Sequence, residues 1–355
     1  MKIAIFCPSW VGDMVMATPA LRAVRRDFPQ ATVVAVVRPY VAGVLDGLDL
    51  VDRRILHDPR RAYIASDDHD GLAGWPFGAQ LRRENFDAAI LLTNTFRSAF
   101  WAWVGGIKRR IGFDSRGRGW MLTDPIPAPS ATVPHPVLDN YLQLAARLGC
   151  TNLNRQTELA TSPEAEFQLQ SFWKDCRLGE YATQGVICLN PGGAFGSSKH
   201  WPSESFAELA VQIATRLNKR VLVLCGPSER ESARQIVTIA RHPAVVSLAD
   251  QRLSLALTKA AIRNAELLVT TDSGPRHFAA PFAVPVVTLF GPTHTAWSET
   301  YYERSRHLQL EMDCGPCQKR VCPLKHHRCM RDLSVDWVFR AVVSLQEQYP
   351  VSDAA

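Results

Sequence analysis

The chain has 355 residues, of which 46% are hydrophobic and 21% are charged, and its formal net charge is +6. This composition is typical of a folded globular protein and excludes fibrous and disordered classes, while the length favours two domains. The modest positive charge favours an anionic partner without indicating nucleic acid, and no apolar run is long enough to span a membrane.

The chain begins with a predicted strand, turn and helix. Residues 2–7 are mostly apolar and predict a buried strand, and a turn over 8–13 precedes a helix over about 14–27. Asp13 is therefore expected near the N-cap of this helix. A second strand is predicted over 31–37. Because the chain enters a strand directly, without a signal-peptide pattern, we expect a cytoplasmic protein whose nine cysteines are reduced thiols.

An acidic stretch follows at Asp67, Asp68, His69 and Asp70. It superficially offers the Asp-x-Asp spacing of metal-dependent sugar-nucleotide enzymes. No predicted strand leads into it, so we interpret it as a solvated acidic loop.

The next strand is predicted over 86–93, and residues 94–98 turn the chain into a helix that ends near Gly105 and Gly106. A basic stretch interleaved with glycines and aromatics follows. It contains Lys108, Arg109, Arg110, Arg116 and Arg118. Such a stretch suits contact with a negatively charged acceptor, and simple solubility is the alternative interpretation. A helix is predicted over 137–148, and the weakly patterned span 151–184 is the predicted interdomain region.

The second half begins with a strand over 186–190 that opens into a Gly- and Ser-rich loop containing Ser197, Ser198 and Lys199. A helix starts after Pro202, so the loop stands at a strand-to-helix junction, where phosphate-binding loops occur. Its spacing is neither that of a P-loop nor that of the dinucleotide fingerprint. A strand over 220–225 then leads to Glu229 and Glu231. These glutamates are candidates for binding ribose hydroxyls, or they simply favour the start of the next helix over about 229–241.

The stretch 267–292 predicts a strand, a tight turn, a short helix and another strand. The turn contains Asp272, Ser273 and Gly274, and His277 lies in the first turn of the helix. A helix N-terminus with small residues before it offers unpaired N–H groups to a phosphate, although Asp-Ser-Gly is also common capping chemistry. We expect Lys199, Ser273, Gly274 and His277 to line one diphosphate pocket.

Four cysteines cluster near the C-terminus, spaced C-x2-C-x4-C-x6-C, ahead of a final helix over 334–346. They are Cys314, Cys317, Cys322 and Cys329. In a reducing compartment this spacing suggests a structural zinc site or an iron–sulfur cluster, with free thiols and a disulfide as alternatives.

Four motifs, taken together, resemble glycosyltransferase family 9, and within it the type II ADP-heptose:lipopolysaccharide heptosyltransferases. The resemblance covers nearly the whole chain. The motifs are Ser9-Trp10-Val11-Gly12-Asp13, Asn94-Thr95-Phe96-Arg97-Ser98-Ala99, Asn190-Pro191-Gly192 through Lys199-His200-Trp201-Pro202, and Thr271-Asp272-Ser273-Gly274-Pro275-Arg276-His277. Arg276 and Asp250 depart from the family pattern.

The resemblance implies a GT-B fold of the α/β class, with two Rossmann-like domains whose parallel sheets face a central cleft. We place the acceptor-binding domain at 1–178 and the donor-binding domain at 179–355. It also implies an inverting transfer of heptose from ADP-heptose to the inner-core heptose of a lipid A-linked precursor, with no cofactor for catalysis. Asp13 would be the general base.

The remaining expected site residues divide between donor and acceptor. Donor binding is assigned to Lys199, Ser197, Ser198, Glu229, Asp272, Ser273, Gly274 and His277, and acceptor binding to Trp10, Asn94, Arg97, Arg116 and Arg118. We expect a monomer at the inner face of the inner membrane. The alternatives are a family 9 transferase with another donor or acceptor, as in type I or type III enzymes, and a non-catalytic sugar-nucleotide-binding protein.

Overall fold

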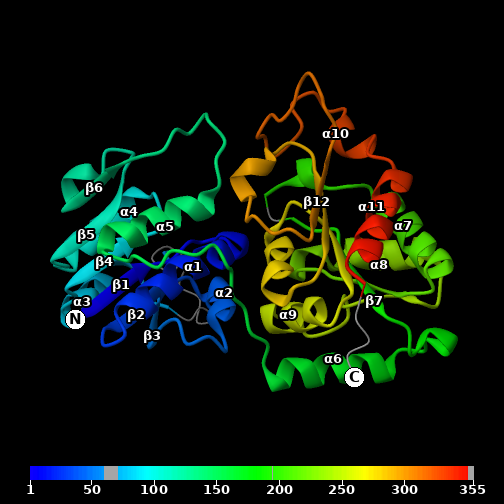
Figure 1. Cartoon of the computed structure of the whole chain (residues 1–355), viewed down its shortest axis with the longest axis horizontal. Coiled ribbons are helices and arrows are strands. Elements are labelled where there is room, and N and C mark those ends of the chain that lie inside the picture. Colours follow the sequence, from blue (N-terminus) through cyan, green and yellow to red (C-terminus); the bar gives the residue numbers. More distant parts are fainter. Residues whose placement is uncertain (60–70, 194, 351–355) are drawn as a thin grey trace. The chain divides into compact units, whose positions relative to one another are not determined.

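The computed structural model describes residues 1–59, 71–193 and 195–350 (Figure 1). These residues form two compact units, Met1–Ala160 with Ala296–Tyr301, and Thr161–Thr295 with Tyr302–Ala355. Each unit is built on a six-stranded sheet in which every neighbouring pair of strands is parallel. The acidic stretch Asp67, Asp68, His69 and Asp70 lies outside the described residues.

The first sheet has the strand order β3-β2-β1-β4-β5-β6. Its strands are β1 (Lys2–Phe6), β2 (Thr32–Val37), β3 (Arg53–Leu56), β4 (Ala88–Leu91), β5 (Arg109–Asp114) and β6 (Asp124–Pro127). Its helices are α1 (Val11–Asp27), α2 (Pro39–Ala42), α3 (Gly74–Glu84), α4 (Phe96–Val104) and α5 (Val137–Leu148). Helices α1 and α5 pack together, as do α3 and α4, and a core cluster joins α3 and α4 to the sheet.

The second sheet has the order β12-β11-β10-β7-β8-β9. Its strands are β7 (Val186–Asn190), β8 (Arg220–Val223), β9 (Val245–Ser247), β10 (Leu267–Thr271), β11 (Val286–Phe290) and β12 (Ser305–Gln309). Its helices are α6 (Pro163–Asp175), α7 (Ser203–Arg216), α8 (Arg230–Ala240), α9 (Leu255–Arg263), α10 (Arg328–Arg331) and α11 (Val335–Gln348). Helix α7 packs against α8 and α11, and α6 packs against α9.

Counted along the chain within each unit, both sheets have the doubly wound order 3-2-1-4-5-6. The predicted α/β class with two Rossmann-like domains is therefore confirmed. The inner strands are buried along nearly their whole length, as expected for parallel strands covered on both faces.

Several details differ from the expectations. The units divide between Ala160 and Thr161, not at 178, because α6 packs against α9 of the second unit. The basic stretch, for which no strand was predicted, contains strand β5, where Arg109 forms an ion pair with Asp124. The short helix after β10 is a 3-10 helix, Gly274–Phe278.

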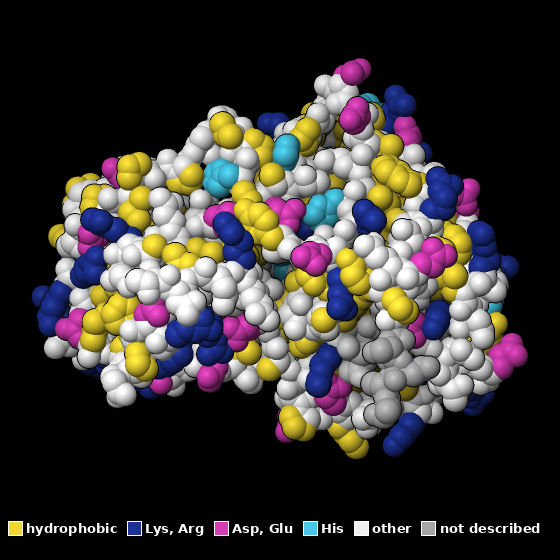
Figure 2. Space-filling model, viewed as in Figure 1, with side chains coloured by type: hydrophobic (Ala, Val, Ile, Leu, Met, Phe, Trp, Pro, Cys, Tyr) yellow, Lys and Arg dark blue, Asp and Glu magenta, His cyan; other side chains and the backbone are white. Residues whose placement is uncertain are grey.

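No helix among residues 1–59, 71–193 and 195–350 has the length and apolarity needed to cross a bilayer. On the face of the molecule drawn in Figure 2, Lys and Arg side chains are interspersed with Asp and Glu. The positive net charge is thus not gathered into one basic surface on that face.

Candidate functional site

The strand order reverses between β1 and β4 in the first unit and between β7 and β10 in the second. Ligands of doubly wound sheets bind beyond the carboxyl ends of the strands at such a reversal, where the loops on either side diverge. Strands β7 and β10 pair with Asn190 beside Thr270, so the loops that begin at Pro191 and at Asp272 leave the sheet side by side. The two predicted donor motifs therefore meet at the switch point of the second sheet.

A buried ion pair joins these two loops. Lys199 Nζ lies 2.5 Å from Asp272 Oδ2 and donates to the Asp272 carbonyl oxygen at 2.8 Å, and both side chains are about one-tenth exposed. Thr293 donates its hydroxyl to the same carboxylate at 2.6 Å. Burial raises the pKa of Asp272, but the positive charges of Lys199 and Arg276 and the hydrogen bonds outweigh it, so that the pKa is lowered overall.

His277 lies on the 3-10 helix Gly274–Phe278, which follows β10, and its side chain is buried. Burial, reinforced by the charge of Arg276, holds the pKa of His277 well below its usual value. The imidazole is therefore neutral near pH 7, and it contributes hydrogen bonding but no positive charge to an anion. Positive charge at this end of the sheet comes instead from Lys199 and Arg276.

Asn190, which begins the third motif but was not among the expected donor-binding residues, fixes the turn after β10. Its Nδ2 donates to Thr270 Oγ1 at 2.9 Å and to Ser273 Oγ at 2.8 Å. Ser273 then precedes Gly274, the first residue of the 3-10 helix. One feature of the sequence indicated this role for Asn190, namely its position as a polar amide at the end of a buried apolar strand.

Glu229 connects two loops through its carboxylate. Its Oε1 accepts from Gly193 N at 2.9 Å and its Oε2 from Gly226 N at 2.8 Å. A Cβ on Gly192 would lie 2.1 Å from this carboxylate, so only glycine allows the approach. Ser197 and Glu229 also line a hollow of about 380 Å³. Glu231 points to solvent and forms an exposed ion pair with Arg234.

Ser198 does not face this hollow. Its side chain is buried, and its hydroxyl donates to the Lys319 carbonyl oxygen at 2.6 Å. Ser198 thus attaches the Lys199 loop to the cysteine-rich segment, rather than contacting a donor directly. The four cysteines of that segment line a small cavity.

In the first unit, Asp13 lies beyond the carboxyl end of β1, which is one of the two strands at the switch point. Helix α1 begins at Val11 with Trp10 as its N-cap residue, so Asp13 is an acidic residue of the first turn, not the cap itself. Asp13 is half-buried, and its charge adds to burial in raising the pKa of the buried Tyr141. Trp10 is exposed.

The loop after β4 is organised by Arg118, which is completely buried. Its guanidinium donates to the side chain of Asn94 at 3.1 Å and to that of Ser98 at 3.2 Å. It also donates to three carbonyl oxygens, those of Phe113, Thr93 and Thr95. The expectation that Arg118 contacts an acceptor is corrected, because its donors are used inside the protein. Arg97 and Arg116 are exposed and stay available.

The two departures from the family pattern have different settings. Asp250 forms an ion pair with Arg234 on the surface, at 2.7 Å. Arg276 is buried, donates to His307 Nε2 at 2.8 Å, and has its guanidinium 5.2 Å from the ring centroid of Phe290. Of the two, Arg276 is the one that changes the charge at the end of β10.

Comparison with known proteins identifies sequences that are related to this chain. A sequence profile of glycosyltransferase family 9 (heptosyltransferase) matches residues 75–328, more than half of the chain. Lipooligosaccharide heptosyltransferase 2 of Campylobacter jejuni is 26% identical over 97% of this chain and 98% of its own length. Lipopolysaccharide heptosyltransferase 2 of Escherichia coli is 24% identical over 97% of this chain and 98% of its own length.

Solved structures share the fold. The structure of Escherichia coli ADP-heptose lipopolysaccharide heptosyltransferase II superimposes with a TM-score of 0.77 at 24% identity, over 98% of this chain and 99% of that one. The glycosyl transferase family 9 structure from Veillonella parvula gives a TM-score of 0.79 at 22% identity, over 98% and 97% of the two chains.

Proposed function

Because the chain belongs to glycosyltransferase family 9, we propose that it acts as a monomer that transfers heptose from ADP-heptose to the inner-core heptose of a lipid A-linked lipopolysaccharide precursor. The observation that carries the proposal is the meeting of the Lys199 and Asp272 loops at the switch point of the second sheet. Relatives named heptosyltransferase 2 that align over nearly their full length favour this donor and acceptor.

The donor's diphosphate would bind at the Lys199–Asp272 pair. The leaving group of this reaction is ADP, and its developing negative charge needs a fixed positive partner. Asp272 orients the Lys199 ammonium group, and Arg276 adds a second positive charge nearby. We propose that these side chains, with the backbone N–H groups that follow β7 and β10, replace a metal ion in this role. Glu229 would bind the ribose beside the hollow.

Asp13 would be the base. In a single displacement, the acceptor hydroxyl oxygen forms a bond to the anomeric carbon of heptose while the bond from that carbon to the diphosphate oxygen breaks. The configuration inverts, and the hydroxyl proton passes to the Asp13 carboxylate. The position of Asp13 beyond β1, at the reversal of strand order, supports this role.

A test of the whole proposal is incubation of the purified protein with a panel of nucleotide sugars and a heptose-primed acceptor, with product masses recorded. Transfer from ADP-heptose with a mass gain of one heptose is the expected result. Preference for another nucleotide sugar or another acceptor would identify a different family 9 transferase. Donor binding with neither transfer nor hydrolysis would identify a non-catalytic binding protein.

Replacement of Lys199 by methionine is expected to weaken ADP binding about tenfold or more, because a charge-assisted contact contributes about 1.5–3 kcal/mol. Isothermal titration of ADP measures the effect. The exposed Lys174 on α6 supplies a matched control, since Lys174→Met removes the same group far from the switch point of the sheet.

Methionine at position 199 leaves the Asp272 carboxylate buried without its ion pair, which costs stability. The double variant Lys199→Met/Asp272→Asn removes both charges and should recover part of that stability while ADP binding stays weak. A folded Lys199→Met protein with unchanged ADP affinity would remove Lys199 from the donor site.

Membrane contact, which a lipid-linked acceptor requires, has a candidate surface on the first unit. Its aromatic residues are Trp75, Phe96, Phe100, Trp101, Trp103 and Trp120. Trp75 and Trp120 are 72% and 65% exposed. Phe96, Phe100 and Trp103 recur along one face of α4, and the exposed Arg97 follows Phe96 on this helix. Tryptophan beside arginine suits the interface of an anionic bilayer.

Replacement of Trp120 by serine is expected to weaken binding to vesicles containing phosphatidylglycerol about tenfold, since one buried aromatic side chain contributes about 1.5–3 kcal/mol. Sedimentation with the vesicles measures the binding. Phe167 on α6 is 68% exposed and provides the control Phe167→Ser. Equal binding by the two variants would exclude this surface.

A further inference from the structure

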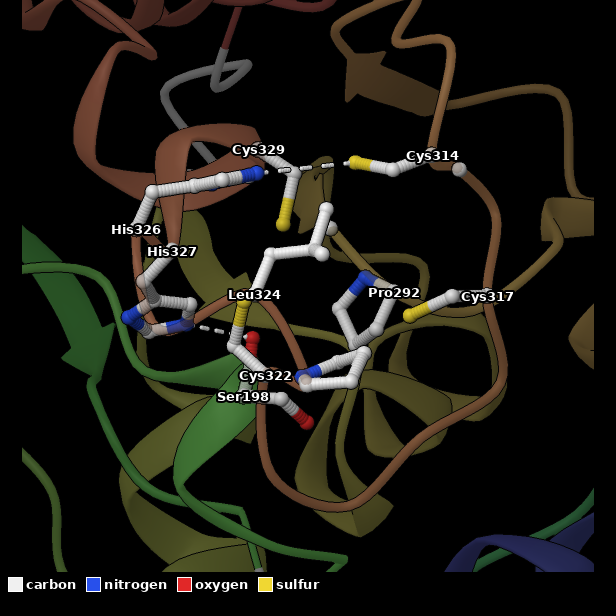
Figure 3. A pocket seen from close by; sticks show the side chains of 12 residues that line it. Ser198, Pro292, Cys314, Cys317, Cys322, Leu324, His326, His327 and Cys329 are labelled. Carbon is white, nitrogen blue, oxygen red and sulfur yellow. Dashed lines mark hydrogen bonds between the residues drawn. The ribbon is translucent and has the colours of Figure 1, made fainter.

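Four of the nine cysteines line one small cavity, and they belong to the segment that connects β12 to α11 in the sequence. Cys314, Cys317, Cys322 and Cys329 lie within 16 residues, and the cavity they share has a volume of about 20 Å³. Figure 3 shows their sulfur atoms directed into the space between them, near Leu324 and Pro292. The other five cysteines, Cys7, Cys150, Cys176, Cys188 and Cys225, are distributed over both units.

The chemistry of this cavity suits a metal ion that prefers sulfur. Thiolates are the ligands of structural zinc sites and of mononuclear iron sites, and a C-x2-C pair is the usual first half of such a site. The Cys322 sulfur also lies beside the backbone N–H groups of residues 324–327. His326 Nε2 lies 3.9 Å from Cys314 Sγ and supplies a further donor at the rim.

The size of the cavity favours one ion over a cluster. A volume of about 20 Å³ is only slightly more than the roughly 10–15 Å³ that one water-sized sphere occupies. An iron–sulfur cluster holds several iron and sulfide atoms and needs more room. In residues 1–59, 71–193 and 195–350, no three His, Cys, Asp or Glu side chains already stand at coordinating distance. Binding therefore involves rotamer changes of these half-exposed cysteines.

The segment that carries the cysteines also holds the loop of Lys199. Between Cys317 and Cys322, the Lys319 carbonyl oxygen accepts from Ser198 Oγ at 2.6 Å and the Arg320 carbonyl oxygen accepts from Ser198 N at 3.2 Å. Between Cys322 and Cys329, His327 Nε2 donates to the Ser198 carbonyl oxygen at 2.7 Å. All three contacts are made by residues that lie between two of the cysteines in the sequence.

Two further contacts tighten this junction. A Cβ on Gly196 would lie 2.3 Å from the Arg320 carbonyl oxygen, so the two backbones meet closely at this glycine. Two cations approach the Phe195 ring, with Lys199 Nζ 4.6 Å and the Arg320 guanidinium 5.4 Å from its centroid. A movement of the cysteine-rich segment would therefore move the loop on which Lys199 stands.

We propose that Cys314, Cys317, Cys322 and Cys329 bind a single thiophilic divalent cation, zinc or ferrous iron, and that this cation fixes the segment that holds the Lys199 loop. The ion has a structural and positioning role, because its ligands belong to the segment that holds the Lys199 loop and not to the loop itself. The effect on ADP binding rests on the proposed donor site, whereas the metal content does not.

The first test is elemental analysis of protein purified anaerobically and without added metal. About one zinc or iron per chain is expected for a single four-thiolate site. Cys317→Ser should lose the metal, whereas Cys176→Ser, at a half-buried cysteine outside the segment, should retain it. Absence of both metals, or thiol counting that finds the four cysteines paired in disulfides, would overturn the proposal.

A second test needs no variant and so does not depend on how Cys317→Ser folds. Metal-free protein loaded with Co²⁺ should show the absorption of cobalt bound by thiolates in tetrahedral geometry, and one equivalent of Zn²⁺ should remove it. A cobalt spectrum without thiolate bands would contradict the assigned ligands.

The positioning role has its own readout. Chelation of the metal should lower the melting temperature and weaken ADP binding, and restoring zinc or ferrous iron should reverse both. Unchanged stability and ADP affinity on metal removal would refute the positioning role. Failure of wild-type protein to bind ADP with its metal in place would count against the donor site alone.

Discussion

Replacement of Asp13 by asparagine is expected to reduce turnover by a factor of about 100 or more while the protein folds and binds ADP normally. Asparagine keeps the size of the side chain and can still accept a hydrogen bond, but its amide does not take the proton from the acceptor hydroxyl. Trp10 occupies the N-cap of α1, so the variant leaves the cap unchanged. Steady-state transfer with saturating ADP-heptose measures the effect.

The control for Asp13 is another acidic residue in the first turn of a helix. Asp336 holds that place in α11, behind the N-cap Ser334, and it is exposed. Asp336→Asn should cost about 0.3–1 kcal/mol of helix-dipole stabilisation and leave turnover unchanged. If turnover in Asp13→Asn stayed near that of wild type, the role of the Asp13 carboxylate would be to stabilise the first turn of α1, without acting as a base. Loss of the acidic limb of the pH–rate profile in Asp13→Asn would mark the base.

The second large effect concerns stability. Arg118→Met is expected to destabilise the first unit by roughly 3 kcal/mol or more, because removing one partner of a buried charged network leaves the others unpaired. Five acceptors surround the guanidinium. Burial lowers the pKa of Arg118 to about 10, so the group is still charged at neutral pH. The shift of the urea midpoint measures the loss.

A neighbouring arginine provides the matched control for Arg118. Arg97 on α4 is exposed, and Arg97→Met should change stability by no more than about 0.5 kcal/mol. Comparable midpoints in the two variants would show that the network around Arg118 is dispensable. A rise in the KM for the acceptor in Arg97→Met alone would assign the acceptor contact to the exposed arginine.

Most of the inner strands were predictable, whereas the inner strand β5 and the edge strands β3, β6 and β12 were not. Strands β7, β10 and β11 are mostly apolar and buried at every residue, because both of their faces are covered. Edge strands have solvent on one side, so β3 begins with two arginines, β6 contains two prolines and β12 carries arginine and histidine. Their polar sequences look like loops until the neighbouring strand is known.

The candidate site was predictable to a similar degree. The meeting of Lys199 with Asp272 follows from strand order, since both loops leave the same end of the sheet. The burial of Arg118 does not follow, because an arginine among glycines has the same local pattern whether it faces water or a polar pocket. Ser198 was likewise assigned to the donor, and only the fold reveals its partners at Lys319 and Arg320.

The division of the chain between the two units affects the order of events during synthesis. The first unit includes Ala296–Tyr301, and Tyr301 donates its hydroxyl to Asp139 Oδ2 at 2.6 Å and stacks against Arg155. A nascent chain of 160 residues lacks these contacts. The ribosome must deliver Tyr301 before the first unit has all its contacts, and residues 319–327 before the Lys199 loop has its support. A translation product truncated before Tyr301 therefore leaves both units incomplete, with surface exposed that the full chain covers.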